Sequence, residues 1–263
     1  MDKYQFLKEE ERLDYTLQTL NDEVLNYIEK RKEIANYILD YRKNFIEEHK
    51  DDEDALMEYF DHERYVKEEY YKQIDKKLME LTKLKETPYF GKVIFSDEDD
   101  CQEEIYVGRY GLTKDATFES IIIDWRAPIA SLFYKGSLGP ATYKTPDGEL
   151  SADILARRQF VIKKGSLQGY FDSEVDVKDE ILQMILSSNS GEKLKDIVMT
   201  IQQEQDDIIR EERMKVVVVN GVAGSGKTTI ALHRVAYLLY NYRQQLGNKV
   251  LVLGPNDIFV DYI

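Results

Sequence analysis

The chain has 263 residues, of which 43% are hydrophobic and 33% are charged, and its net charge is −14. This composition excludes a disordered chain and a uniformly basic nucleic-acid-binding domain, although an acidic protein can still carry a local basic groove. The single cysteine, Cys101, excludes a disulfide framework and a cysteine-based zinc site, and the lack of a signal peptide or of an apolar run of about 18 residues predicts a cytoplasmic protein without a membrane partner.

Residues 1–86 contain no Pro and no Gly, and their apolar residues recur at the alternating steps of a heptad pattern. The first stripe, interrupted at Arg31, consists of Leu13, Leu17, Leu20, Val24, Tyr27, Ile34, Ile38, Tyr41 and Phe45. The second consists of Leu56, Tyr59, Val66, Tyr70, Ile74, Leu78, Leu81 and Leu84, with Glu63 at one seam position. We predict an antiparallel helical hairpin, a coiled-coil arm over residues 1–86, that reaches about 65 Å.

The stretch between the two stripes, EEHKDDED, is strongly acidic. Its carboxylates belong to Glu47, Glu48, Asp51, Asp52, Glu53 and Asp54. One interpretation is a tip that contacts a partner; the other is a solvated turn, because charge runs are usually exposed surface. Residues 1–86 hold 24 acidic and 16 basic residues, so the arm carries more than half of the excess negative charge.

From Pro88 onward, short β-rich runs alternate with turn signals, which predicts a small antiparallel β-domain over residues 87–173. The runs are Gly91–Phe95, Glu104–Arg109, Ser120–Asp124, Ala130–Tyr134, Ala141–Lys144, Gln159–Lys163 and Leu167–Phe171. The string DWRAPIA, from Asp124 to Ala130, is the most distinctive part. We interpret Trp125 as a core anchor, and expect Arg126 to pair with Asp124 or with a neighbouring carboxylate at a structural corner.

Residues 174–263 return to helical patterns and then alternate strand and helix. Helices are predicted around Val177–Ile185, over Lys193–Glu212 and over Thr229–Tyr242. The β-branched runs Lys215–Asn220 and Lys249–Leu253 are typical of buried parallel strands. Together with the last helix, they predict one βαβ unit.

The sequence GVAGSGKT, Gly221 to Thr228, matches the P-loop pattern between a predicted strand and a predicted helix. Gly221, Gly224 and Gly226 allow close backbone approach to phosphate oxygens, and the amides from Gly224 through Ser225 to Thr229 form an anion cradle at a helix N-terminus. Lys227 would reach the β- and γ-phosphates, and Thr228 would ligate Mg²⁺. We predict a site for ATP and Mg²⁺; the alternative is a glycine-rich turn without a ligand.

Hydrolysis also needs an Asp that holds Mg²⁺ and a residue that positions the attacking water. Only 35 residues follow Thr228, and their only carboxylates are Asp257 and Asp261. Neither lies at the end of an apolar strand. We therefore expect this chain to bind ATP without splitting it, and the sequence looks like an interrupted domain.

The run GVAGSGKTTIALHRVAYLLY resembles the first ATPase motif of superfamily 1 helicases of the UvrD/Rep type. Upstream, IQQEQDDII is similar to their Q motif, which implies that Gln205 reads adenine. Downstream, KVLVLGPNDIF is similar to motif Ia, which implies that Pro255 and Asn256 lie near single-stranded nucleic acid.

The segments PYFGKVIF, EEIYVGRYG, IIIDWRAPIASLFY and KDIVMTIQQEQDDIIR closely resemble the HelD family, bacterial superfamily 1 ATPases also called DNA helicase IV. The resemblance implies an α+β multidomain chain: the arm, the β-domain, then a helical connector and the beginning of a P-loop, RecA-like domain 1A. It also implies ATP-dependent action on DNA and on RNA polymerase, with removal or recycling of stalled polymerase. The arm would enter the polymerase secondary channel and place acidic residues near Mg²⁺ there.

Members of that family continue with a DE-type Mg²⁺ motif and a second RecA-like domain, so the chain resembles an N-terminal fragment. An alternative is a non-catalytic module that binds RNA polymerase and whose arm carries the function. A coiled-coil P-loop protein of the chromosome-maintenance type fits less well, because here the helical arm precedes the P-loop.

Overall fold

The computed structural model describes residues 3–48, 62–98, 100–135, 137–145, 148–172, 203–212, 216–222, 224–247 and 249–254. Contacts divide the chain into two compact units. The first combines Met1–Trp125 with Ile154–Glu174, and the second combines Arg126–Asp153 with Val175–Ile263. The predicted domain boundaries at residues 87 and 174 stay predictions.

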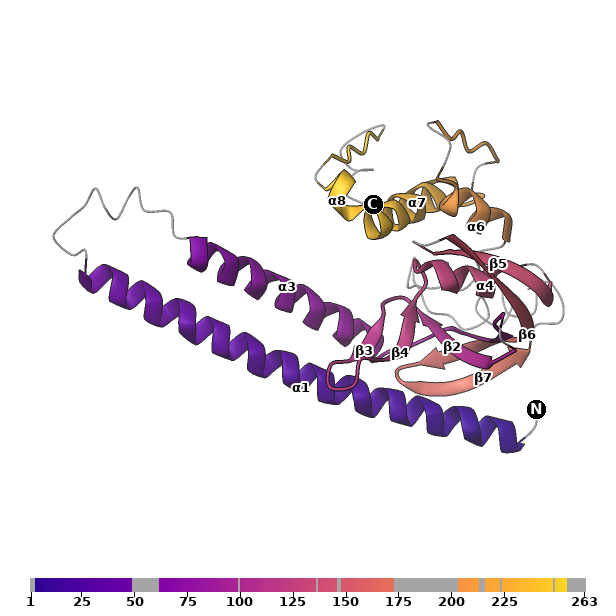
Figure 1. The fold of residues 1–263 in the computed structure, drawn as a ribbon, viewed down its shortest axis with the longest axis horizontal. Helices are drawn as coiled ribbons and strands as arrows, with labels where there is room; N and C mark the ends of the chain where they lie inside the picture. Colours follow the sequence, from indigo (N-terminus) through magenta and orange to yellow (C-terminus); the bar gives the residue numbers. More distant parts are fainter. Residues whose placement is uncertain are drawn as a thin grey trace. The chain divides into compact units, whose positions relative to one another are not determined.

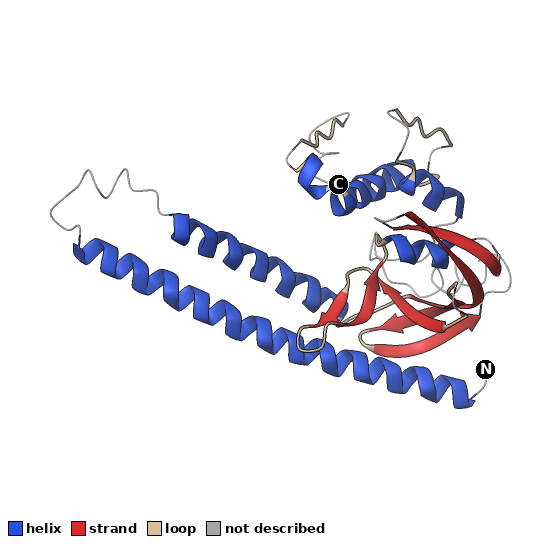
Figure 2. Cartoon of the chain, in the orientation of Figure 1, coloured by secondary structure: helices blue, strands red, loops and turns tan. Residues whose placement is uncertain are grey.

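The predicted hairpin is formed by α1 (Lys3–Glu48) and α3 (His62–Leu84), which run side by side in the first unit (Figures 1 and 2). The most deeply buried residues of the two stripes are Leu13, Leu20, Ile34, Ile74, Leu81 and Leu84. Leu13, Leu20, Leu81 and Leu84 belong to the core that the base of the hairpin shares with the strands, and Ile34 and Ile74 are buried further along the arm. The heptad pattern therefore identified the side of each helix that is buried at the base.

Further along the arm, the predicted stripe of α3 is wrong at two positions, because Val66 and Tyr70 are exposed. Arg31 Nε instead bonds Asp75 Oδ1 at 2.5 Å and its guanidinium lies 5.0 Å from the centre of the Tyr71 ring. Two helices alone have little apolar surface to share, so polar and aromatic contacts hold this part of the seam.

The strands form one seven-stranded sheet with the order β3-β4-β2-β1-β6-β5, and β7 pairs with β6. Their bounds are β1 Gly91–Ser96, β2 Gln102–Gly108, β3 Leu112–Lys114, β4 Glu119–Asp124, β5 Gly139–Thr145, β6 Gly148–Lys163 and β7 Ser166–Asp172. The predicted all-antiparallel sheet is wrong, because β2 and β4 are parallel, with Val107 opposite Ile123. The short β3 lies between them in sequence and reverses the chain, so β4 returns in the direction of β2.

Two further differences concern local structure. The predicted strand Ala130–Tyr134 is helical: a 3₁₀ turn, η1 (Pro128–Ala130), leads into α4 (Ser131–Tyr134). Pro128 has the fixed backbone angle that suits the first position of a helix, and this local preference outweighs the β-prone side chains after it. The strand β3, by contrast, forms between the predicted runs Glu104–Arg109 and Ser120–Asp124, where turn signals were expected.

An aromatic cluster fills the core between α1 and the sheet of the first unit. Tyr89 packs edge-on against Tyr106 and Phe160, with ring centroids 4.8 and 5.1 Å apart. Close backbone approach beside this cluster requires Gly108, because an added Cβ would lie 2.4 Å from the carbonyl oxygen of Pro88. The base of the arm and the sheet therefore share one core.

Over its described residues, the second unit contains η1, α4, β5, the first part of β6, and three later helices. These are α6 (Gln203–Arg210), α7 (Lys227–Asn241) and α8 (Arg243–Leu246). Helix α7 confirms the helix predicted after the P-loop, and α6 covers part of the helix predicted over Lys193–Glu212. The helix predicted around Val177–Ile185 lies outside the described residues.

The two strands predicted beside the P-loop are not formed over the described residues 216–220 and 249–253. Val218 and Leu253 are each 85% exposed. A β-branched run becomes a buried parallel strand only when other strands and helices cover it, and no described strand pairs with these two runs. No described helix combines the length and the apolar character needed to cross a lipid bilayer.

Candidate functional site: the P-loop segment and the anchored arm

The P-loop segment turns sharply into α7. Gly226 caps the helix with φ +82°, and Gly224 has the same φ, a conformation that glycine adopts without the strain of a side chain. The amide of Ile230 is the first to bond a helix carbonyl, that of Gly226, at 3.0 Å. The preceding amides of the first turn have no acceptor within the helix, so the N-terminus of α7 can accept an anion.

Lys227 reaches back across this loop. Its Nζ donates to the carbonyl oxygens of Gly221 at 2.9 Å and Val222 at 2.6 Å. Gly221 lies so close to Ser225 that an added Cβ would be 2.8 Å from the serine Oγ. The structure thus brings together Gly221, Ser225 and Lys227, and the lysine ammonium is held by carbonyls that phosphate oxygens can replace with stronger, charge-assisted bonds.

The neighbouring predicted residues lie on the first turn of α7. Thr228 is exposed and Thr229 is half-buried, while Ile230 is buried against the rest of the second unit. An exposed hydroxyl next to the lysine has the chemistry of a Mg²⁺ ligand, and the assignment of Thr228 to Mg²⁺ stays a prediction.

The predicted adenine reader, Gln205, lies half-buried on α6. This helix is attached to α7 by Arg234, whose Nη1 donates to the carbonyl oxygens of Ile208 at 2.5 Å and Ile209 at 3.5 Å. Among the described residues, no hydrogen bond joins Gln205 to the P-loop segment, and its role as the adenine reader stays a prediction.

A second cluster, which sequence reasoning missed, surrounds Arg210 at the end of α6. Its Nε bonds Asp206 Oδ1 at 2.8 Å, and its Nη1 donates to the carbonyl oxygen of Ala127 at 3.2 Å. The guanidinium lies 5.2 Å from the centre of the Tyr237 ring on α7. Burial raises the pKa of Asp206, and the charge of Arg210 opposes that rise. The four-residue spacing of Asp206 and Arg210 was the only sequence signal for this contact.

Two neighbouring residues of the DWRAPIA string, Trp125 and Arg126, have different structural roles. Trp125 is buried, which confirms the predicted core anchor. The guanidinium of Arg126 lies 4.7 Å from the centre of the Tyr240 ring, and Asn241 Nδ2 donates to the Arg126 carbonyl at 3.3 Å. Arg126 therefore contacts α7, the helix that begins at the P-loop, and the Ala127 carbonyl contacts α6 through Arg210.

Glu212, which follows α6, contacts both α7 and β5. It accepts a hydrogen bond from the Tyr237 hydroxyl at 2.9 Å and lies 3.5 Å from Lys144 Nζ. Burial acts to raise the pKa of Glu212, but hydrogen bonds from Tyr242 and Tyr237 and the charge of Lys144 hold that pKa below its ordinary value. Burial and Glu212 together raise the pKa of Tyr242 to about 12.

The base of the arm is anchored by Glu9, a buried carboxylate on α1 that is only 2% exposed. Its Oε1 accepts from Lys92 Nζ at 3.1 Å and from Arg158 Nη1 at 2.8 Å, and its Oε2 accepts from the Tyr106 hydroxyl at 3.0 Å. Three strands, β1, β2 and β6, thus bond one side chain of α1. Burial, followed by the charge of Glu9, raises the pKa of Tyr106.

A second attachment lies further along α1, at the turn between β3 and β4. Glu23 Oε1 accepts from the Asp115 amide at 3.1 Å, and Lys30 Nζ pairs with Asp115 Oδ2 at 2.7 Å. The hydrogen bond to Asp115 raises the pKa of Lys30. The arm is therefore fixed to the sheet at two separate points.

Comparison with protein-family models shows the family of this chain. The family model for the N-terminal domain of DNA helicase IV, HelD, matches residues 6–184. The chain belongs to the HelD family. No curated protein matches the sequence. The HelD match includes the arm, the sheet and the Glu9 cluster, and the P-loop segment follows it in the chain.

The remaining predicted residues of this HelD-family chain are placed only in part. Glu47 is exposed at the end of α1. The side chain of Glu48, the other acidic-tip residues Asp51 to Asp54, and the predicted nucleic-acid contacts Pro255 and Asn256 lie outside the described residues. Their roles stay predictions.

Proposed function

We propose that this chain is the N-terminal part of a superfamily 1 helicase-like ATPase that binds ATP with Mg²⁺ and acts on DNA and RNA polymerase, removing or recycling stalled polymerase. The family match over residues 6–184 carries this proposal. The P-loop geometry supplies the support for nucleotide binding.

In this proposal, Lys227 exchanges the carbonyls of Gly221 and Val222 for the β- and γ-phosphates. The free amides at the start of α7 hold the phosphate oxygens, and Gln205 contacts the adenine. Thr228 holds Mg²⁺, which neutralises phosphate charge. The two carboxylates after α7, Asp257 and Asp261, lie outside the described residues, so the proposal concerns nucleotide binding by this chain and not hydrolysis.

Calorimetric titration with Mg-ATP tests the nucleotide site. We expect saturable binding that Lys227→Ala weakens at least about tenfold, because one charge-assisted contact to phosphate is lost. Arg243→Ala is the control, since it removes one exposed cation from the same unit, outside the loop. Absence of binding by the unaltered chain, or equal affinity of all three proteins, would contradict the ATP assignment.

The arm is the part proposed to contact RNA polymerase, by entry into its secondary channel. Two attachments, at Glu9 and at Asp115, hold the base of the 46-residue α1, so a load on the arm can reach the sheet. Carboxylates at the tip are suitable ligands for Mg²⁺. The same observation favours the second candidate, a polymerase-binding module in which the arm alone carries the function.

A pull-down of RNA polymerase, combined with a transcription assay, separates binding by the arm from an active role of its tip. One variant changes the tip residues Glu47, Glu48, Asp51, Asp52, Glu53 and Asp54 to Ala. The control changes six exposed carboxylates of α1 to Ala: Glu10, Glu11, Asp14, Asp22, Glu29 and Glu33. We expect only the tip variant to lose its effect on transcription; if both variants behave like the unaltered chain, the tip has no active role.

The two candidates differ in their need for nucleotide. If Lys227→Ala, placed in the complete protein, leaves polymerase release unchanged while the tip variant abolishes it, the non-catalytic module is correct. Loss of release in both variants supports the motor.

The predicted nucleic-acid contact at Asn256 has its own test. Asn256→Ala should weaken binding of a single-stranded oligonucleotide, and unchanged binding would remove that contact from the proposal.

A further inference from the structure

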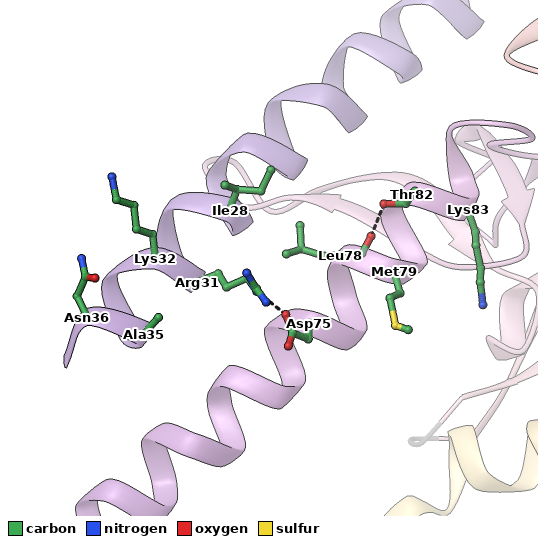
Figure 3. A pocket seen from close by; sticks show the side chains of 10 residues that line it. All are labelled: Ile28, Arg31, Lys32, Ala35, Asn36, Asp75, Leu78, Met79, Thr82 and Lys83. Atoms are coloured by element: carbon green, nitrogen blue, oxygen red, sulfur yellow. Dashed lines mark hydrogen bonds and ion pairs between the residues drawn. The ribbon is translucent and has the colours of Figure 1, made fainter. Parts of the chain in front are cut away.

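A groove of about 830 Å³ runs between α1 and α3 (Figure 3). Ile28 projects from α1 and Leu78 from α3 toward the space between the helices, and the Arg31–Asp75 ion pair crosses it. Its walls include Ala35, Met79 and the aliphatic part of Thr82. The groove therefore has a largely apolar floor within the arm, away from the P-loop segment in sequence.

Large apolar side chains on this face of the arm are exposed to solvent. Met79 is 59% exposed, Ile28 is 48% exposed, and Leu25 and Leu39 continue the same side of α1 at 60% and 63% exposure. The spacing from Leu25 through Ile28, Lys32 and Ala35 to Leu39 follows helical steps of three and four. This solvent-exposed face is apolar except at Lys32, and such surfaces are typical contact sites for other molecules.

The residues that line the groove carry a net positive charge, whereas the whole chain is acidic. Its only lining acid, Asp75, is paired with Arg31 at 2.5 Å. Two lining lysines, Lys32 and Lys83, form no ion pair with any described residue. The lining is therefore positive on a chain whose net charge is −14.

We propose that this groove binds an amphipathic helix of a partner protein, with an apolar stripe on the groove floor and acidic residues beside Lys32 and Lys83. A groove between two helices accepts a third helix through anchors at helical spacing, and opposite charges at the rim favour the acidic partner. Sedimentation distinguishes this partner from a second copy of the chain. This docking site is separate from the acidic tip and requires no nucleotide.

Fluorescence anisotropy with synthetic helical peptides of about 20 residues tests the proposal. One labelled peptide carries leucines at helical spacing flanked by Glu; a second has the same leucines flanked by Lys. We expect the acidic peptide to bind at least about tenfold more tightly, and its affinity to fall with salt. Equal affinity of both peptides, or no binding of either at about 1 mM, would overturn the proposal.

Two variants of the full chain locate the binding site. Lys32→Glu/Lys83→Glu should reverse the preference toward the basic peptide, and Met79→Glu should weaken both peptides. The controls Lys8→Glu/Lys163→Glu and Leu7→Glu make the same changes at exposed positions outside the groove, and melting curves confirm that all variants fold. Unchanged preference in the double variant overturns the proposal, as does sedimentation showing a dimer that Met79→Glu dissociates, since a second copy would then occupy the groove.

Discussion

The base of the arm and the P-loop segment each contain a lysine whose ammonium bonds oxygen atoms of the chain. The first lysine attaches the arm to the sheet, and the second is available to a ligand. Lys92 is buried and bonded to the carboxylates of Glu9 and Glu104, so its partners are permanent and its role is attachment. Lys227 bonds the neutral carbonyls of Gly221 and Val222 in an exposed loop. Weaker, solvent-accessible partners can be replaced, which makes Lys227 available to a ligand.

The largest expected effect is at Glu9. Glu9→Gln removes the charge shared by Lys92 and Arg158 and should lower the free energy of unfolding by about 3 kcal/mol, since each buried cation keeps only one other carboxylate partner. Urea unfolding followed by circular dichroism measures the loss. Glu10→Gln, at the exposed neighbouring position, is the control. A loss below about 1 kcal/mol would show that the buried cluster does not anchor the arm.

The packing of the same unit predicts the next effect. Gly108→Ala places a Cβ against the carbonyl oxygen of Pro88 and 2.6 Å from Ile122 Cγ2, which should cost about 2 kcal/mol of stability. Gly111→Ala is the matched control, because its added Cβ would meet nothing closer than 3.5 Å. Equal melting temperatures for the two variants would mean that the close approach beside β2 is relaxed in solution.

These attachments also show what the sequence could and could not predict. Heptad spacing predicted the hairpin and its buried base, and turn signals located β1, β2, β4 and β7. The Glu9 cluster was missed because its partners, Lys92, Tyr106 and Arg158, lie 83, 97 and 149 residues away. Local spacing carries no information on such pairs.

Errors near the P-loop have a different cause. The run Val216–Asn220 has the side chains of a buried parallel strand, but strand formation depends on neighbours that local sequence does not specify. The loop glycines and the start of α7 were predicted well, because left-handed φ angles and helix capping are local properties. The role of Gln205, by contrast, depends on a tertiary contact that local sequence does not specify, and it stays a prediction.

A smaller, pH-dependent effect is expected in the second unit. The pKa of Glu212 is held below its ordinary value of 4.5, so its stabilisation is present above that pH and is lost as the pH falls through the lowered pKa. Melting curves of the unaltered chain and Glu212→Gln should differ at pH 7 and converge toward pH 3 or so. A difference that persists or grows in acid would contradict the bonds drawn from Tyr237 and Lys144.

The smallest stability effect is expected at the P-loop lysine. Lys227→Ala removes two bonds that are exposed to solvent, so it should change the free energy of unfolding by less than about 0.5 kcal/mol. The same urea unfolding series measures it beside Glu9→Gln. A loss as large as that of Glu9→Gln would mean that Lys227 is a structural residue like Lys92, and the contrast between the two regions would fail.

Amide hydrogen exchange with and without Mg-ATP tests the central claim most directly, because it reports on both regions in one experiment. We predict that Mg-ATP slows exchange of the amides from Gly224 to Thr229, at the loop and the first turn of α7, and leaves the amides around Glu9 and Lys92 unchanged. The slowing should be absent in Lys227→Ala. Unchanged exchange across the P-loop segment at saturating Mg-ATP would contradict the assignment of this segment as the nucleotide site.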